Sequence, residues 1–175
     1  MALAAPRALP DRSSGALSPA PSELRLALYQ PDRPHNFGAA LRLCACLGVG
    51  LDLIEPCGFP LDDRRIREAA LDYAPHARWV RHREFAAFDA ARLENSRRLV
   101  LLSAAGSLPH HLAPFLPDDA LLVGSESGGV SSAVHQRADL RVRIPMRPGL
   151  RALNLVGAAA IVLAEAMRQT GGFDG

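Results

Sequence analysis

Short runs of apolar residues alternate with longer segments in which apolar positions recur every three or four residues, from about Leu24 onward. The short runs predict β-strands, and the longer segments predict amphipathic helices. Because strands and helices alternate, we expect an α/β fold, with a mainly parallel sheet and helices on both of its faces. The expected strands are 24–29, 51–54, 78–80, 99–103, 120–123 and 140–144, and the expected helices are 37–47, 62–71, 83–93, 109–115, 131–138 and 154–169.

Residues 1–23 do not share this pattern. They are rich in Ala, Pro and Ser and have no periodic apolar face, so we expect a disordered tail. Proline and arginine interrupt every apolar run there that a signal peptide would need, and no segment of the chain approaches the ~20 apolar residues of a membrane span. Residues 24–175 have the length of one domain, which we expect to be soluble and cytoplasmic.

All 20 basic residues are arginines, and the chain contains no lysine. This excludes a phosphate-loop lysine and a Schiff-base lysine from the possible chemistry. The formal net charge is only +2, but Arg143, Arg147 and Arg151 flank one glycine- and proline-containing loop. Two interpretations of these three remain open, namely solvated surface residues or contacts to an anion or RNA, and the loop favours the second.

The three cysteines, Cys44, Cys46 and Cys57, are odd in number, which argues against a disulfide framework. Cys44 and Cys46 lie two positions apart in a predicted helix, so their side chains diverge and cannot readily bind one metal ion. We expect all three to be buried small hydrophobic residues, and the histidines have no carboxylate or cysteine at ligand spacing. The sequence therefore predicts no metal site.

Two loops that follow apolar strands contain the strongest signal in the chain. Residues 124–129 (Gly-Ser-Glu-Ser-Gly-Gly) and 144–150 (Ile-Pro-Met-Arg-Pro-Gly-Leu) each begin where a predicted strand ends. Loops at the carboxyl ends of parallel strands are where α/β proteins bind small molecules, and glycine lets backbone approach a ligand closely. We expect the two loops to form one pocket.

Arg42 lies in the first predicted helix, which we expect to begin with Asn36 as its N-cap and to end near Gly48. Its neighbours in sequence are apolar on every side, and a buried guanidinium without an anionic partner would be very costly. The partner could be a carboxylate in a salt bridge, or a phosphate at a reacting centre. The residues alone do not decide between these.

The last predicted helix, 154–169, is apolar on nearly every face until Glu165. Such a helix must be covered on several sides. It is either an ordinary core helix or a core helix that also forms a subunit interface.

Together these segments resemble the SPOUT class of RNA methyltransferases, and within it the small tRNA 2′-O-methyltransferases that act on the wobble nucleotide. Residues 36–42 (Asn-Phe-Gly-Ala-Ala-Leu-Arg) resemble the first motif of that family, 124–130 the second, and 144–154 the third. Residues 28–31, 54–59 and 71–73 resemble stretches of the wobble subgroup. The resemblance covers about 24–169, nearly all of the chain outside the tail.

The resemblance implies a C-terminal trefoil knot, bound S-adenosylmethionine and no metal. It also implies a homodimer that completes each active site, and the anticodon stem-loop of a tRNA as the RNA partner. It implies that Arg42 orients the ribose 2′-OH and its phosphate, and that Glu126 and Asn154 orient the loop, the ribose or Arg42. The implied cofactor-binding residues are Leu102, Gly124, Ile144, Met146, Ala152 and Leu153, and the implied RNA-binding residues are Asn36, Arg147 and Arg151.

The chain departs from the family pattern at a few polar positions. Ala152 stands where serine is common, Val156-Gly157 where a Ser-Asn pair is common, and Ser127-Gly128 lacks a frequent arginine. Besides the wobble methyltransferase, two further functions therefore remain open. One is a 2′-O-methyltransferase acting at another tRNA position or on ribosomal RNA, and the other is an RNA-binding module of the same fold that has lost catalysis.

Overall fold

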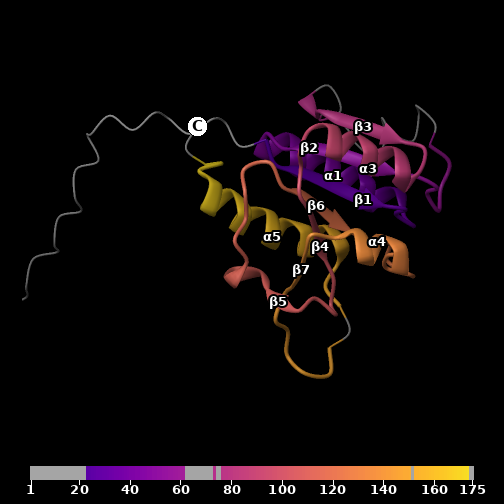
Figure 1. Cartoon of the computed structure of the whole chain (residues 1–175). Coiled ribbons are helices and arrows are strands. Elements are labelled where there is room, and N and C mark those ends of the chain that lie inside the picture. The colour runs from indigo at the N-terminus through magenta and orange to yellow at the C-terminus, as the bar shows by residue number, and fades with distance from the viewer. Residues whose placement is uncertain (1–22, 62–72, 74–75, 151, 174–175) are drawn as a thin grey trace, which may run out of the picture.

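The computed structural model describes residues 23–61, 73, 76–150 and 152–173. In these residues, seven strands form one sheet in the order β3-β2-β1-β6-β4-β7-β5, and every neighbouring pair is parallel (Figure 1). The predicted α/β fold is thereby confirmed. The strands are β1 (Arg25–Tyr29), β2 (Gly50–Ile54), β3 (Trp79–His82), β4 (Leu99–Leu102), β5 (Leu108–Pro109), β6 (Ala120–Val123) and β7 (Leu140–Arg143), and the helices are α1 (Pro34–Leu47), α3 (Phe85–Glu94), the 3₁₀ turn η2 (His110–Leu112), α4 (Ser132–Arg137) and α5 (Leu155–Thr170).

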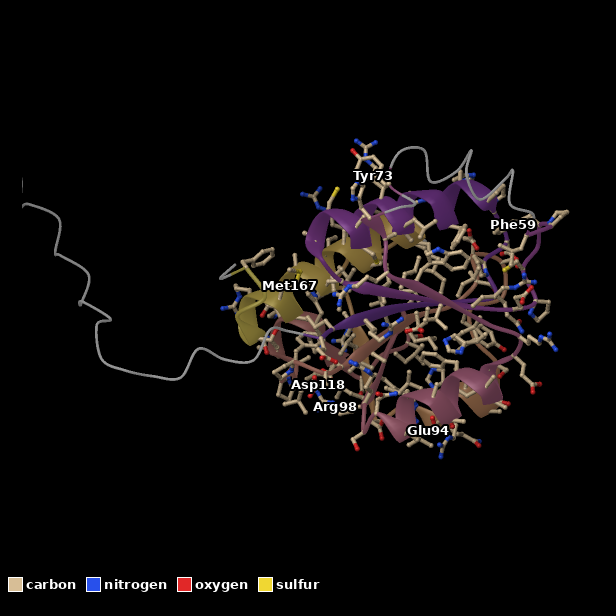
Figure 2. The ribbon with its side chains drawn as sticks, turned by 90° about the horizontal axis from the view of Figure 1, so that it is seen from above. Phe59, Tyr73, Glu94, Arg98, Asp118 and Met167 are labelled. Atoms are coloured by element: carbon tan, nitrogen blue, oxygen red, sulfur yellow. The ribbon has the colours of Figure 1, made fainter. Side chains whose placement is uncertain are left out.

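Helices cover both faces of the sheet, which is why its central strands are apolar throughout. Figure 2 shows α1 and α5 on one side of the sheet and α3 on the other. Phe37 of α1 and Leu163 of α5 belong to the core on the first side, whereas Phe88 of α3 and Val134 of α4 belong to the core on the second. The carboxyl ends of all the strands lie at one edge of the sheet because the strands are parallel.

The start of α1 differs from the prediction. The helix begins at Pro34, with Arg33 rather than Asn36 as the N-cap residue, and Asn36 lies inside the first turn. Proline at the first helical position has a preset φ and lacks an N–H that would otherwise be unsatisfied, so it starts the helix earlier. Gly48 ends α1 in the left-handed conformation, with φ of 67°, as expected.

The prediction of a helix over 109–115 is wrong. Leu108–Pro109 instead pairs with β7, and only the three residues of η2 are helical. Pro109 and Pro114 bracket this short turn, and proline inside a helix removes a hydrogen bond and clashes with the preceding turn. Elsewhere in the described residues, apart from the start of α1, predicted and observed limits agree within two residues.

At one side of the sheet, the order of the strands differs from their order in the sequence. β4 and β5 follow each other in the sequence, yet β7 lies between them. The loop joining β4 to β5 crosses tightly over β7, because a Cβ added at Gly106 would lie 2.4 Å from the carbonyl carbon of Val142. β7 therefore lies between two strands that precede it in the chain and contacts the loop that joins them.

A buried ion-pair cluster joins the first three strands. Asp52 of β2 accepts from Arg25 Nε at 2.5 Å, and its other oxygen lies 2.8 Å from His82 Nε2 of β3. Asp52 is only 4% exposed. Burial opposes ionisation, but the hydrogen bonds from His82 and Arg25 outweigh it and hold the pKa of Asp52 below its ordinary value.

Some single-residue expectations are corrected and others lie outside the described residues. Cys44 is buried and Cys57 half-buried, but Cys46 is exposed, because α1 turns it away from the sheet.

Helix α5 begins after Asn154 and leaves Gly157, Ile161 and Ala164 exposed along one stripe. The helix predicted over 62–71 lies outside the described residues, as does the tail, and no described helix is long and apolar enough to cross a membrane.

Candidate active site

The two glycine-bearing loops meet, as predicted, at one cavity of about 600 Å³ at the carboxyl edge of the sheet. The ends of β4, β6 and β7 form its base, and the start of α5 forms one side. Nine of the predicted site residues line it: Asn36, Leu102, Gly124, Glu126, Ile144, Met146, Ala152, Leu153 and Asn154.

The loop after β6 is a closed turn that only small residues allow. Ser125 and Gly129 exchange two backbone hydrogen bonds, of 2.9 and 3.0 Å, and Gly129 has a φ of +64°. A Cβ added at Gly124 would lie 2.5 Å from the carbonyl carbon of Gly129. This turn directs the side chain of Glu126 towards the first helix.

Both carboxylate oxygens of Glu126 accept hydrogen bonds from the segment that leads into α1. The backbone N–H of Asp32 donates to Oε2 at 2.8 Å, and Asn36 Nδ2 donates to Oε1. In return, the N–H of Ser127 donates to the Asp32 carboxylate at 2.8 Å. Hydrogen bonds from Ser127 lower the pKa of Asp32, so this carboxylate is ionised at neutral pH.

Asn154 connects the third motif, 144–154, to Asn36. Its Oδ1 accepts from the N–H groups of Val156 and Gly157, at 3.0 and 3.2 Å, and so caps α5. Its Nδ2 donates to Asn36 Oδ1 at 3.2 Å. Hydrogen bonds therefore join Glu126, Asn36 and Asn154, one residue from each of the three motifs, into one chain.

The opposite wall of the cavity is apolar and is held by the loop after β4. Leu102 ends β4 and Ile144 follows β7, and the N–H of Ser103 donates to the carbonyl of Val142 at 2.9 Å. Arg143 holds the same loop, since its Nη1 donates to the carbonyls of Gly106 and Ser107. These bonds keep the ends of two neighbouring strands in register around the cavity.

Arg42 does not line this cavity. It lies six residues after Asn36 on α1, which places it about 120° away around the helix axis. Contrary to the expectation of burial, the side chain is exposed, and its guanidinium carbon lies 4.9 Å from the centre of the Tyr73 ring. Within the described ranges, no carboxylate forms an ion pair with Arg42. Figure 2 labels Tyr73 on the outer side of α1.

The other predicted RNA contacts are placed differently. Arg147 is exposed in the loop after β7 but does not line the cavity, and Arg151 lies outside the described residues. Among the residues of the site that the sequence did not predict are Asp32 and Arg33, which precede the first motif. Only proximity in sequence to Asn36 could have pointed to them, because the partners of Asp32 lie far away in the chain and Arg33 lies in no motif.

No cysteine is among the described residues that line the cavity. Burial raises the pKa of the Cys44 and Cys57 thiols to about 12. No cluster of three potential metal ligands occurs in the described part of the chain. The cavity instead offers apolar strand ends on one side and an amide and carboxylate network on the other.

A family model described as the SpoU rRNA Methylase family matches residues 23–164. The chain belongs to this family. A tRNA (cytidine(34)-2'-O)-methyltransferase of Beijerinckia indica is 56% identical over 146 residues, which are 83% of this chain and 91% of the relative. The relative of the same name from Escherichia coli K12 is 39% identical over 150 residues, covering 85% of this chain and 94% of that protein.

Solved structures of this family have the same fold. One described as "Structural insights into the 2-OH methylation of C/U34 on tRNA" matches with a TM-score of 0.81 and 40% identity, covering 87% of this chain and 99% of that one. The SpoU methyltransferase AviRb from Streptomyces viridochromogenes, in complex with the cofactor AdoMet, matches with a TM-score of 0.74 and 26% identity, covering 86% of this chain and 58% of that one.

Proposed function

We propose that the protein is an S-adenosylmethionine-dependent 2′-O-methyltransferase that modifies the wobble nucleotide, position 34, of tRNA in the cytoplasm. The observation that carries the proposal is the convergence of Asn36, Glu126 and Asn154 at one cavity. It occurs in a chain that is 56% and 39% identical to two relatives named for this reaction.

The cavity suits S-adenosylmethionine in size and chemistry. Its volume of about 600 Å³ lies in the range of small-molecule sites, and such sites are largely apolar with a few placed polar groups. When bound, the cofactor supplies an electrophilic methyl group. The residues that would hold it are Leu102, Gly124, Ile144, Met146, Ala152 and Leu153.

The residues of the polar wall act by positioning. Both carboxylate oxygens of Glu126 are already engaged by Asp32 and Asn36, so Glu126 fixes its loop rather than accepting a proton. Asn36 and Asn154 keep the first and third motifs in contact. Aligning the 2′ oxygen with the methyl group can supply much of the reduction in barrier.

We further infer that the functional unit is a homodimer in which Arg42 orients the ribose and its phosphate. The stripe Gly157, Ile161 and Ala164 on α5 is apolar and exposed in the single chain, and its first residue lies beside Asn154 of the cavity. Burial of this stripe by a second copy would remove it from water. Light scattering at micromolar concentration should give twice the mass of the chain, and Ile161→Glu should reduce it to the mass of one.

The proposal includes a C-terminal trefoil knot. It is supported by the position of β7 between β4 and β5, and by the loop at Gly106 that crosses tightly over β7.

Action on ribosomal RNA is the second candidate, because the matching family is described by that substrate. A neighbour described as an rRNA methyltransferase from Sinorhizobium meliloti is 25% identical, and the match covers 58% of that chain. The relatives named for tRNA are more similar and match over nearly their whole length, so tRNA is favoured. A binding module without catalysis is disfavoured, because the network around Glu126 is intact despite the apolar residues at Ala152 and Val156.

The decisive experiment uses the purified full chain, labelled S-adenosylmethionine, and tRNA transcripts with cytidine or uridine at position 34. Mass spectrometry of the nucleosides should find 2′-O-methylation at that nucleotide. The matched control is the same RNA with 2′-deoxycytidine at position 34, which lacks the accepting hydroxyl and should take no label there. Label at another nucleotide, or in ribosomal RNA alone, would overturn the assignment to the wobble position. Cofactor binding without any transfer would favour the binding module.

A further inference from the structure

Most arginines in the described part of the chain are held by oxygen atoms of the protein itself. Arg25, Arg81 and Arg98, for example, each form paired hydrogen bonds with one carboxylate. Others donate to backbone carbonyls, as Arg78 does to that of Gly48. These guanidinium groups have partners and serve the fold.

Arg33 differs from them. It is exposed, it lines the cavity, and within the described ranges its side chain has no hydrogen bond or ion pair. Of the described residues that line the cavity, the charged ones are Arg33 and Glu126. Glu126 already accepts from the N–H of Asp32 and the amide of Asn36, and Arg33 is the one cationic side chain among the described residues that line the cavity.

The backbone that carries Arg33 is held on both sides. Before it, Asp32 exchanges hydrogen bonds with the loop of Glu126 and Ser127. After it, Pro34 begins α1, and the carbonyl of Arg33 accepts from the N–H of Asn36 at 3.2 Å. A cationic side chain on an anchored backbone can bind an anion with little further ordering of the chain.

We propose that Arg33 binds a backbone phosphate of the substrate RNA at the mouth of the cavity, next to the nucleotide that is methylated. This inference rests on the proposed function. A guanidinium binds phosphate through two parallel hydrogen bonds, and it keeps its charge at every relevant pH. Arg33 lines the cavity and lies in the chain between Asp32 and Asn36, which both donate hydrogen bonds to Glu126. The anionic groups that an RNA brings to the cavity are the phosphates flanking the target ribose.

The test compares initial rates for wild type, Arg33→Gln and Arg33→Lys with an anticodon stem-loop RNA as substrate, over a range of RNA and salt concentrations. Arg33→Gln should raise KM for the RNA by about tenfold. It should also reduce the slope of log KM against the logarithm of the salt concentration by about 0.7, which is the contribution of one phosphate contact in single-stranded nucleic acid. Arg33→Lys should restore the salt dependence and part of the affinity, because it restores the charge without the paired geometry. Affinity for S-adenosylmethionine, measured by calorimetry without RNA, should stay unchanged.

The matched control is Arg168→Gln. Arg168 is also exposed, but it pairs with Glu165 near the far end of α5, about 21 Å along the helix from Asn154. This variant should keep the KM and the salt dependence of the wild type.

Two results would overturn the inference while leaving the proposed function in place. In the first, the wild type methylates RNA and Arg33→Gln has the same KM and salt dependence. In the second, the loss in Arg33→Gln falls on affinity for S-adenosylmethionine, which would assign Arg33 to the cofactor carboxylate. If the wild type transfers no methyl group to RNA, the proposed function fails and the inference fails with it.

Discussion

Asp32 and Glu126 lie 94 positions apart, and each holds the other's loop. The N–H of Asp32 donates to the Glu126 carboxylate at 2.8 Å, and the N–H of Ser127, next to Glu126, donates to the Asp32 carboxylate at 2.8 Å. Two such bonds in opposite directions fix both the distance and the orientation of the loops after β1 and β6. They hold the mouth of the cavity in shape before any ligand arrives.

Glu126→Gln should impair methyl transfer more than cofactor binding. The amide has the same size, but one of its two ends is a donor and must face either the N–H of Asp32 or the amide of Asn36. Hydrogen bonds to charged groups contribute about 1.5–3 kcal/mol, so we expect kcat/KM to fall by about 10- to 100-fold. Steady-state kinetics would measure this. Glu94→Gln, at the outer end of α3 (Figure 2), is the control and should behave as wild type. Equal activity in both variants would show that the charge of Glu126 is dispensable.

Gly124→Ala should destroy the glutamate loop. The added Cβ would lie 2.5 Å from backbone of Gly129, which cannot move without breaking the pair of bonds between Ser125 and Gly129. We expect S-adenosylmethionine to bind at least about tenfold more weakly by calorimetry, while circular dichroism shows a folded protein. Gly128→Ala is the matched control in the same loop, because its Cβ would meet only the hydroxyl of Ser125 at 3.5 Å. If both variants bind the cofactor equally well, the loop is not part of the cofactor site.

Arg42→Ala should be folded, dimeric and able to bind the cofactor, but inactive. The side chain is exposed and packs on Tyr73, so its removal leaves the core unchanged. If Arg42 aligns the ribose and its phosphate, transfer should fall by roughly a hundredfold or more, because alignment matters mainly in the transition state. Near-normal turnover would exclude this role.

The position of Arg42 outside its own chain's cavity allows a sharper test by mixing. If Arg42 of one copy serves the cavity of the other, then combining inactive Arg42→Ala chains with inactive Glu126→Ala chains should restore activity. A mixed dimer would contain one site in which both residues are intact. No recovery after subunit exchange would place Arg42 and Glu126 in the same chain's site, or exclude Arg42 from catalysis.

Asp52→Asn should destabilise the fold without touching the cavity. It removes the charge that pairs with Arg25 and His82, and breaking a buried ion pair costs about 3–5 kcal/mol. Urea unfolding at pH 7 would measure the change in the free energy of unfolding. Asp118→Asn, an exposed carboxylate at the amino edge of the sheet (Figure 2), is the control and should change it little.

The Asp52 carboxylate also makes the free energy of unfolding depend on pH. The pKa of Asp52 is lower in the folded chain than its ordinary value of 3.8, so its ionised form stabilises the fold at every pH above 3.8. That contribution is lost as the pH falls below 3.8 through the folded-state pKa. The wild type should therefore lose more of its free energy of unfolding than Asp52→Asn over this acidic range. Parallel losses in the two proteins would contradict the pKa shift.

Local pattern determined the class of the fold and the two loops of the site. Periodicity separates strands such as β4 and β6 from helices such as α5, because each must present apolar side chains at its own spacing. Gly124, Gly129 and Pro145 mark sharp turns through their own backbone preferences, which neighbouring residues hardly alter. These features could be recognised without knowing what lies opposite them in space.

Only the tertiary structure decided which distant segments meet. The insertion of β7 between β4 and β5, and the pairing of Asp32 with Glu126, depend on contacts between residues far apart in the chain. Asn36 was predicted to cap a helix but binds Glu126, and Arg42 was predicted to be buried but is exposed, for the same reason. A helical pattern states which face of a segment is apolar, but not which other segment lies against it. The roles of polar residues such as Asn36, Arg33 and Arg42 depend on that opposing surface, which no local pattern contains.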